Sequence, residues 1–118
     1  MIKYAACMLG VVAVADAPAG PPPGDYVCQT WSANREGLAY VDRLTIAPGE
    51  EYSLKETGGG GRYRYDLAAD ALVFANGPLA GHFVGQYVPA DRGVPNIHIH
   101  DAYRSNRLFD WSCELHRG

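Results

Sequence analysis

Gly24-Asp25-Tyr26-Val27-Cys28-Gln29-Thr30-Trp31 is the stretch that decides the fold of this chain. Its side chains alternate with a period of two, which is the spacing of a β-strand. Tyr26 and Cys28 therefore share one face of the strand. Cys28 has one plausible disulfide partner, Cys113, at the far end of the chain. We expect the rest of the domain to close on this strand.

The residues before this stretch have the form of a secretory signal peptide. Lys3 supplies a short positive region, and the apolar run over residues 4–14 is shorter than the ~20 residues that span a bilayer. Ala13-Val14-Ala15 fits the small-x-small cleavage pattern, so we expect the mature chain to begin at Asp16. The alternative is that the run is the first buried strand or helix. The proline- and glycine-rich residues that follow at once are typical of an extended spacer and disfavour it.

The expected organisation is a signal peptide over residues 1–15, a spacer over 16–24 and one β domain over 25–118. Cys7 is lost with the leader, and two cysteines in an exported chain point to one disulfide, Cys28 to Cys113; two unpaired buried thiols are the alternative. Losing Lys3 takes the formal charge from −3 to −4. A mildly acidic surface disfavours nucleic acid and anionic membranes as partners. We expect a secreted or periplasmic protein.

Eight short segments with period-two alternation follow one another, separated by turn signals roughly every 8 to 12 residues. This pattern is typical of an all-β antiparallel sandwich or up-and-down barrel, and the short turns favour the meander. In a barrel the first strand lies beside the last, as a Cys28 to Cys113 bridge requires. That bridge would stabilise the domain by ~4 kcal/mol through its long loop. The expected strands span about 26–31, 38–46, 52–57, 62–67, 72–75, 82–88, 96–101 and 109–115.

The alternation also predicts which side chains face inward. The strand over 38–46 places Leu38 and Tyr40 on its apolar face, together with one carboxylate, Asp42. The alternation does not explain this carboxylate unless a β-bulge resets the register. On the strand over 62–67, Tyr63, Tyr65 and Leu67 are expected inside.

The glycine and proline residues predict where the turns and loops lie. Gly58 to Gly61 is expected to be a flexible hairpin loop, and Pro89 to Pro95 a second loop. Asn76-Gly77 is expected to turn the chain between two strands. A phosphate cradle at the glycine run is disfavoured, because no Gly-Lys-Ser or Gly-Lys-Thr follows it.

Gly24-Asp25-Tyr26 is similar to the Gly-x-Trp signature on the first strand of lipocalin-type barrels, and Arg117 stands where those barrels carry an arginine near the last strand. The chain also resembles small, uncharacterised secreted bacterial proteins that have Gly-x-Tyr-x-Cys near the start and a Phe-x-x-Gly-Pro-Leu step, here Phe74 to Leu79. The resemblance implies a barrel architecture. It implies no activity, since a fold does not supply one.

His98-Ile99-His100 is the pair most suggestive of a metal site, because residues two apart on a strand share a face. Ile97 and Ile99 belong to the core, so both imidazoles are expected on the outer face, as ordinary surface residues. A metal site there would need a third ligand from His82, Asp101 or His116. No metal and no cofactor are expected.

Nucleophilic catalysis has little support in the sequence. None of Ser32, Ser53, Ser105 and Ser112 lies in a Gly-x-Ser-x-Gly context, and none has a spacing that suggests a histidine base. With the disulfide formed, the mature chain holds no free thiolate. We therefore expect no enzymatic activity.

Aromatic side chains are abundant for so small a domain, and those with a polar end suit either a core or a recognition surface. Core filling is the simpler interpretation. A ligand-facing wall is the alternative, and its candidate residues are Tyr26, Trp31, Tyr63, Tyr65, Tyr87 and Trp111.

Three functions remain open. The first is an exported, non-catalytic barrel that binds a small ligand or an extracytoplasmic protein, which a tyrosine-lined pocket at one barrel end would favour. The second is a secreted hydrolase inhibitor that presents a hairpin such as Gly58–Gly61 or Pro89–Pro95, which a sealed interior with one stiff protruding loop would favour. The third is a metal-dependent enzyme that uses His98 and His100, which requires His82 to converge with them.

Overall fold

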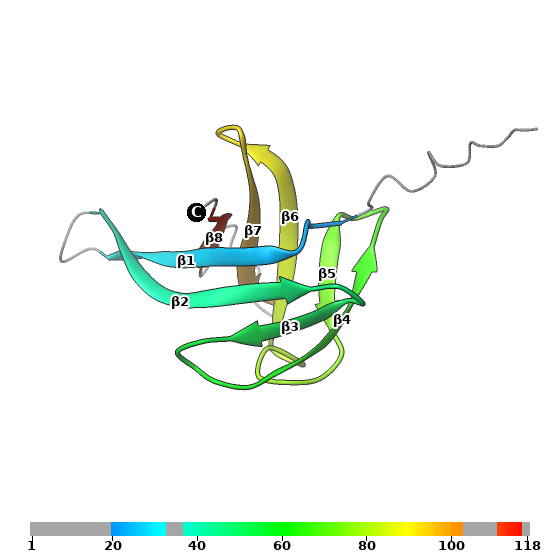
Figure 1. Cartoon of the computed structure of the whole chain (residues 1–118). Coiled ribbons are helices and arrows are strands. Elements are labelled where there is room, and N and C mark those ends of the chain that lie inside the picture. The colour runs from blue at the N-terminus through cyan, green and yellow to red at the C-terminus, as the bar shows by residue number, and fades with distance from the viewer. Residues whose placement is uncertain (1–19, 33–36, 103–110, 117–118) are drawn as a thin grey trace, which may run out of the picture.

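The computed structural model describes residues 20–32, 37–102 and 111–116. Eight antiparallel strands form a closed barrel in the order in which they occur along the chain (Figure 1). The predicted all-β meander is confirmed, and of the two predicted architectures the barrel is the one observed. The strands are β1 (Gly24–Ser32), β2 (Gly37–Ala47), β3 (Glu51–Leu54), β4 (Gly60–Asp66), β5 (Ala71–Phe74), β6 (Phe83–Asp91), β7 (Val94–Asp101) and β8 (Trp111–Leu115).

The barrel closes where β1 meets β8. The two strands pair from Tyr26 opposite Leu115 to Gln29 opposite Ser112, so that Cys28 lies directly opposite Cys113. These two cysteines form a disulfide across 85 residues of sequence. The predicted bridge is confirmed, and it indicates folding in an oxidising compartment.

The suspected β-bulge is present on β2, but it leaves the Asp42 carboxylate on the buried face. Cys28 is paired with Asp42, whereas the next residue of β1, Gln29, is paired with Tyr40, so Val41 is the extra residue. The bulge reverses the faces of β2: Asp42 is buried, while Leu38 and Tyr40 are 50% and 48% exposed. The prediction that Leu38 and Tyr40 face the core is therefore wrong, and the bulge is the reason.

Four hydrogen bonds satisfy the buried Asp42 carboxylate. Its Oδ1 accepts from the backbone N–H groups of Arg43 (2.8 Å) and Glu56 (2.7 Å). Its Oδ2 accepts from the N–H (3.1 Å) and the hydroxyl (2.7 Å) of Thr57. Burial acts to raise the pKa of Asp42, but these hydrogen bonds outweigh it and hold the pKa below the usual range. The carboxylate thus fastens the β3–β4 turn to β2.

Side chains fill the barrel interior, as expected for eight strands. All eight strands contribute buried residues, and Gly85 on β6 leaves room for Ile97, Leu72 and Ile99 beside it. The strand faces predicted for β1 and β7 are confirmed, but Leu67 is 65% exposed because β4 ends at Asp66. The buried apolar residues are Tyr26, Cys28, Leu44, Ile46, Tyr52, Leu54, Tyr63, Leu72, Phe74, Leu79, Ile97, Ile99 and Cys113.

The connection between β5 and β6 covers one end of the barrel. It is longer than the tight Asn76-Gly77 turn expected from the sequence, because the chain continues to Ala80 and buries Leu79. The hydroxyl of Tyr52 fixes it by donating to the Asn76 carbonyl (2.8 Å) and accepting from the Leu79 N–H (3.0 Å).

Residues 20–23 of the spacer pack at the opposite end, where β1 and β5 begin. Pro21 is buried, and Tyr26 donates its hydroxyl to the Pro22 carbonyl at 2.7 Å. Gly20 lies against the ring of Tyr65, so close that a side-chain carbon there would come within 3.2 Å of it. The spacer is thus part of the folded domain from Gly20 onward.

Only the first half of the glycine run, Gly58 and Gly59, lies in the predicted loop between β3 and β4. Gly60 and Gly61 belong to β4 and pair with Ser53 and Tyr52 of β3. A side-chain carbon at Gly61 would collide with Asn76, whose amide oxygen also accepts from the Arg62 N–H at 2.8 Å. Only glycine allows this close approach of backbones.

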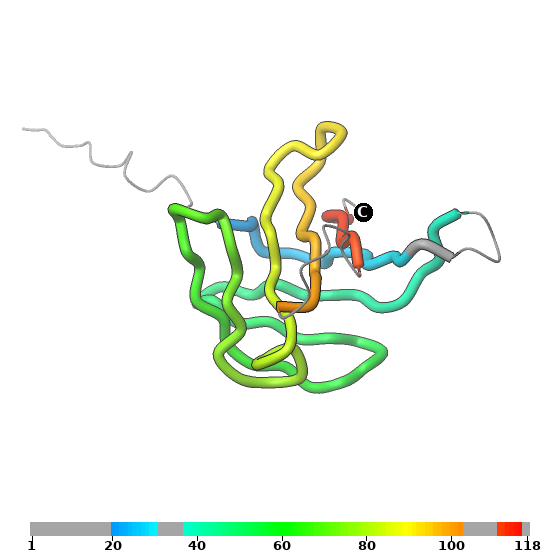
Figure 2. Tube along the Cα trace, turned by 180° about the vertical axis from the view of Figure 1, so that it is seen from behind, coloured from blue at the N-terminus to red at the C-terminus, as the bar shows by residue number. Residues whose placement is uncertain are grey.

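The second predicted loop, Pro89 to Pro95, is also largely strand. β6 runs to Asp91 and β7 begins at Val94, which leaves Arg92 and Gly93 as the turn. Both have positive φ, at 57° and 83°. Two such residues form the type I′ turn, whose twist matches the two strands. The β6–β7 hairpin therefore projects as one stiff unit, away from the β1–β2 hairpin, and Figure 2 shows the same separation from behind.

The expected leader, residues 1–15, and the first part of the spacer lie outside the described residues. Within the ranges that the structure describes, no helix is long and apolar enough to cross a membrane.

Candidate functional site

A cleft of about 400 Å³ lies on the outer side of the barrel. It occupies the angle between the β1–β2 and β6–β7 hairpins, which project in different directions, and β8 lies in that angle (Figure 1). Its volume is within the range of small-molecule sites. The described residues that line it are Gln29, Leu38, Asp91, Arg92, Asn96, His98, Ser112 and Glu114.

Strand register explains why these residues meet. Ser112 of β8 is paired with Gln29 of β1 on one side and with His98 of β7 on the other. One step along, Glu114 is paired with Asn96. Because the neighbouring Cys113 faces the core, these five side chains share the outer face of three adjacent strands.

Asn96 is the most buried residue of the cleft, at 3% exposed. Its amide oxygen accepts a hydrogen bond from the Ser112 hydroxyl at 3.3 Å. Its amide group also lines the cleft, where it can both donate and accept hydrogen bonds.

His98 is held by the hairpin tip. Its Nε2 lies 3.3 Å from Oδ2 of Asp91, and both side chains are partly buried. Asp91 can reach across because the pairing of β6 with β7 shifts between Val88 and Asp91. This contact fixes the tip of the hairpin against the outer face of β7.

The remaining cleft residues supply charge and one apolar surface. Glu114 on β8 and Arg92 at the hairpin tip are both exposed. Leu38, turned outward by the bulge in β2, forms part of the opposite wall. The cleft thus combines two carboxylates, one guanidinium, two amides and a hydroxyl beside an aliphatic side chain.

Asp91, His98 and Ser112 have the side-chain types of a serine hydrolase, but the proton of the serine is directed elsewhere. Ser112 lies opposite His98 across the β7–β8 pair, yet its hydroxyl donates to Asn96. A nucleophilic serine needs a histidine that accepts its proton. The arrangement is therefore suited to hydrogen bonding rather than to nucleophilic attack.

His98 and His100 share the outer face of β7, as the sequence predicts. His82 lies before β6 and is exposed, and its carbonyl accepts from the Ala102 N–H. Across residues 20–32, 37–102 and 111–116, no three His, Cys, Asp or Glu side chains are placed to hold one metal ion.

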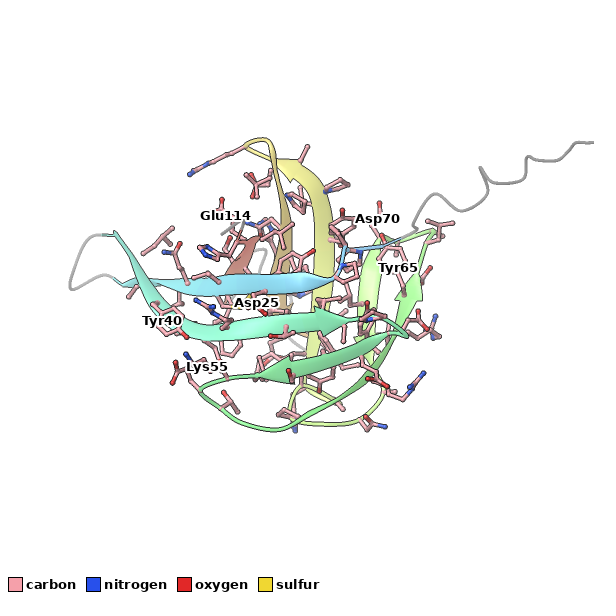
Figure 3. All side chains as sticks on the ribbon, in the orientation of Figure 1. Asp25, Tyr40, Lys55, Tyr65, Asp70 and Glu114 are labelled. Atoms are coloured by element: carbon pink, nitrogen blue, oxygen red, sulfur yellow. A yellow bond between two sulfur atoms is a disulfide. The ribbon has the colours of Figure 1, made fainter. Side chains whose placement is uncertain are left out.

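The tyrosines suggested as a ligand wall lie elsewhere. Tyr26 and Tyr63 are buried in the core, and Tyr65 and Tyr87 pack against it with their rings 6.3 Å apart. Burial raises the pKa of Tyr65 above its usual value, and the hydrogen bond from its hydroxyl to Asp70 (2.7 Å) raises it further. In Figure 3, Tyr65 and Asp70 lie on the side of the molecule away from Glu114.

Trp111 of β8 is half-buried and also packs against the core. Trp31 is paired with Leu38, but its side chain lies outside what the structure describes. Ligand binding by these six aromatic residues stays a prediction.

The sequence holds a partial signal for the cleft. Gln29, His98 and Ser112 alternate with core residues and so were expected on the outer face. Their contact depends on pairing between strands distant in sequence, which the alternation does not give. Nor does it give the bulge that turns Leu38 outward.

Comparison with family models, with curated proteins and with solved structures finds no match to this chain. The function is therefore inferred from the cleft itself.

Proposed function

We propose that this protein is an exported, non-catalytic binding module that holds a small polar ligand in the outer cleft. The carrying observation is an outer cleft of about 400 Å³ lined mainly by polar side chains, among them the amides of Gln29 and Asn96 and the hydroxyl of Ser112. The filled interior supports an outer site over an internal one. The architecture is lipocalin-like, but the ligand lies outside the barrel.

Export rests on the signal-like leader and on the disulfide, which needs an oxidising compartment. Both support a secreted or periplasmic location. The acidic mature chain disfavours nucleic acid and anionic membranes as partners.

The test is native mass spectrometry of the protein purified from its own extracytoplasmic fraction. The wild type should retain a small molecule, and Ser112→Phe, which places a ring in the cleft, should not. Ser53→Phe, on the exposed face of β3, is the matched control and should retain it. Glu114→Lys provides a second cleft variant if Ser112→Phe fails to fold. Equal retention by the cleft variants and the control would show that the ligand binds elsewhere.

A second candidate, a secreted hydrolase inhibitor, is supported by the β6–β7 hairpin. The interior is filled and the hairpin projects with a stiff two-residue turn, which is the combination expected of an inhibitor. Arg92 at its tip would be the contact residue. Inhibition of extracytoplasmic hydrolases that falls in Arg92→Ala but not in Arg64→Ala would favour this candidate, and no inhibition would remove it.

A further inference from the structure

We infer that the ligand of the outer cleft is a carbohydrate, neutral or carrying an amino group, of mono- or disaccharide size. This inference rests on the proposed function and specifies its ligand. It is supported by the hydrogen-bonding groups of the cleft, by their charge and by the paired edges of β8.

The wall of the cleft offers hydrogen-bond donors and acceptors side by side. The amides of Gln29 and Asn96 each have both, and Glu114 accepts only. In the ligand, a hydroxyl group likewise donates and accepts at once. A ring bearing several hydroxyls can therefore hydrogen-bond to the Asn96 amide and to the Glu114 carboxylate from adjacent positions.

The charged side chains of the cleft restrict which ligands it can bind. Two carboxylates, those of Asp91 and Glu114, and one guanidinium, that of Arg92, line the cleft, and Asp91 also contacts His98. The carboxylates therefore outnumber the guanidinium. Phosphorylated or sulfated ligands are therefore disfavoured, whereas an ammonium group is accepted.

The strand pairing at the cleft favours a sugar over an extended peptide as the ligand. Peptides that bind to β-sheets do so by pairing their main chain with a free strand edge. At the cleft, β8 is paired with β1 on one edge and with β7 on the other, from Ser112 to Glu114. Over these three residues β8 has no free backbone edge, so recognition at this wall falls to side-chain amides and carboxylates.

Leu38 completes the fit. A sugar ring has an apolar C–H face as well as polar edges, and Leu38 presents half of its surface on one wall. An aliphatic side chain facing amides and carboxylates suits such a ring better than a uniformly polar wall would.

The test uses the oxidised full-length mature protein and two-dimensional ¹H–¹⁵N NMR titration. The probes are glucosamine, N-acetylglucosamine, its β-1,4-linked disaccharide and maltose. We expect at least one probe to shift the resonances of Gln29, Asn96 and Ser112 as a group. Glu114→Gln and Gln29→Ala should weaken that binding about tenfold and about fivefold, the effects of one hydrogen bond to a charged and to a neutral group.

The matched controls are Glu51→Gln and Ser53→Ala on the exposed face of β3, which should bind as the wild type does. Saccharide shifts outside the cleft, or binding unchanged in the cleft variants, would overturn the inference. If no probe binds but the wild type still retains a molecule that Ser112→Phe loses, the carbohydrate assignment is wrong and the proposed function stands. If neither is seen, both fail.

Discussion

Asp42 shows how one buried carboxylate can be stabilising at neutral pH and a liability in acid. Its four hydrogen bonds come from β2 and from the β3–β4 turn, all to the ionised form. Once protonated, the carboxyl group carries an O–H that is surrounded by other hydrogen-bond donors. It can also accept fewer hydrogen bonds. The sequence marks this residue as anomalous, but only the register of β1 against β2 shows what it binds.

We expect Asp42→Asn to lower the free energy of unfolding by roughly 2 kcal/mol at pH 7, since the amide cannot accept all four bonds. The pKa is lowered in the folded state, so the stabilisation is present above the unfolded pKa of about 3.9 and is lost as pH falls through the folded value. Urea unfolding of wild type and variant should therefore converge below pH 4. A difference in unfolding free energy between wild type and variant that stays constant with pH would contradict this explanation.

A second residue-scale prediction concerns Gly61. A methyl group there would meet the side chain and backbone of Asn76, so Gly61→Ala should destabilise the barrel by about 1–3 kcal/mol. Thermal unfolding measures the loss. Ser53→Ala, on the exposed face of β3, should change the midpoint little. Equal midpoints for the two variants would mean that β4 and the β5–β6 connection can separate at no cost.

The strands themselves follow from the sequence, and their ends do not. Period-two alternation locates all eight strands because one face of each is buried and the other is not. Gly60, Gly61 and Pro89 read as loop residues, yet they extend β4 and β6, since close backbone contact and a two-residue turn favour them there. The same limit hides the cleft: the alternation places His98 on the outer face, but it places Leu38 on the inner one and does not show which outward residues are neighbours.

The β6–β7 turn holds Arg92 in the left-handed region, which is unfavourable for arginine and suits asparagine. Arg92→Asn should therefore raise the free energy of unfolding by roughly 0.5–1 kcal/mol. Calorimetric unfolding measures this. Arg64→Asn, on extended strand β4, should not stabilise and serves as the matched control. A lower midpoint for Arg92→Asn would show that the arginine side chain contributes more than its backbone strain costs.

At the scale of the whole molecule, the disulfide joins the first strand to the last and thereby closes the barrel. The double variant Cys28→Ala/Cys113→Ala should lose about 4 kcal/mol of stability, because the unfolded chain is no longer constrained over 85 residues. Chemical unfolding of oxidised wild type and variant provides the measurement. A loss under ~1 kcal/mol would mean that strand pairing alone closes the barrel. Against a typical net stability of ~5–10 kcal/mol, the expected loss is large.

The position of the bridge also decides how the protein responds to mechanical force. Tension applied at the two ends of the chain passes directly from Cys28 to Cys113 through the covalent bond. Nearly all of β1 to β8 then lies on a bypassed loop and carries no load. That loop hides roughly 300 Å of contour length, which a pulling experiment would release only after reduction. While oxidised, the barrel behaves as a short, nearly inextensible link between whatever its ends are attached to.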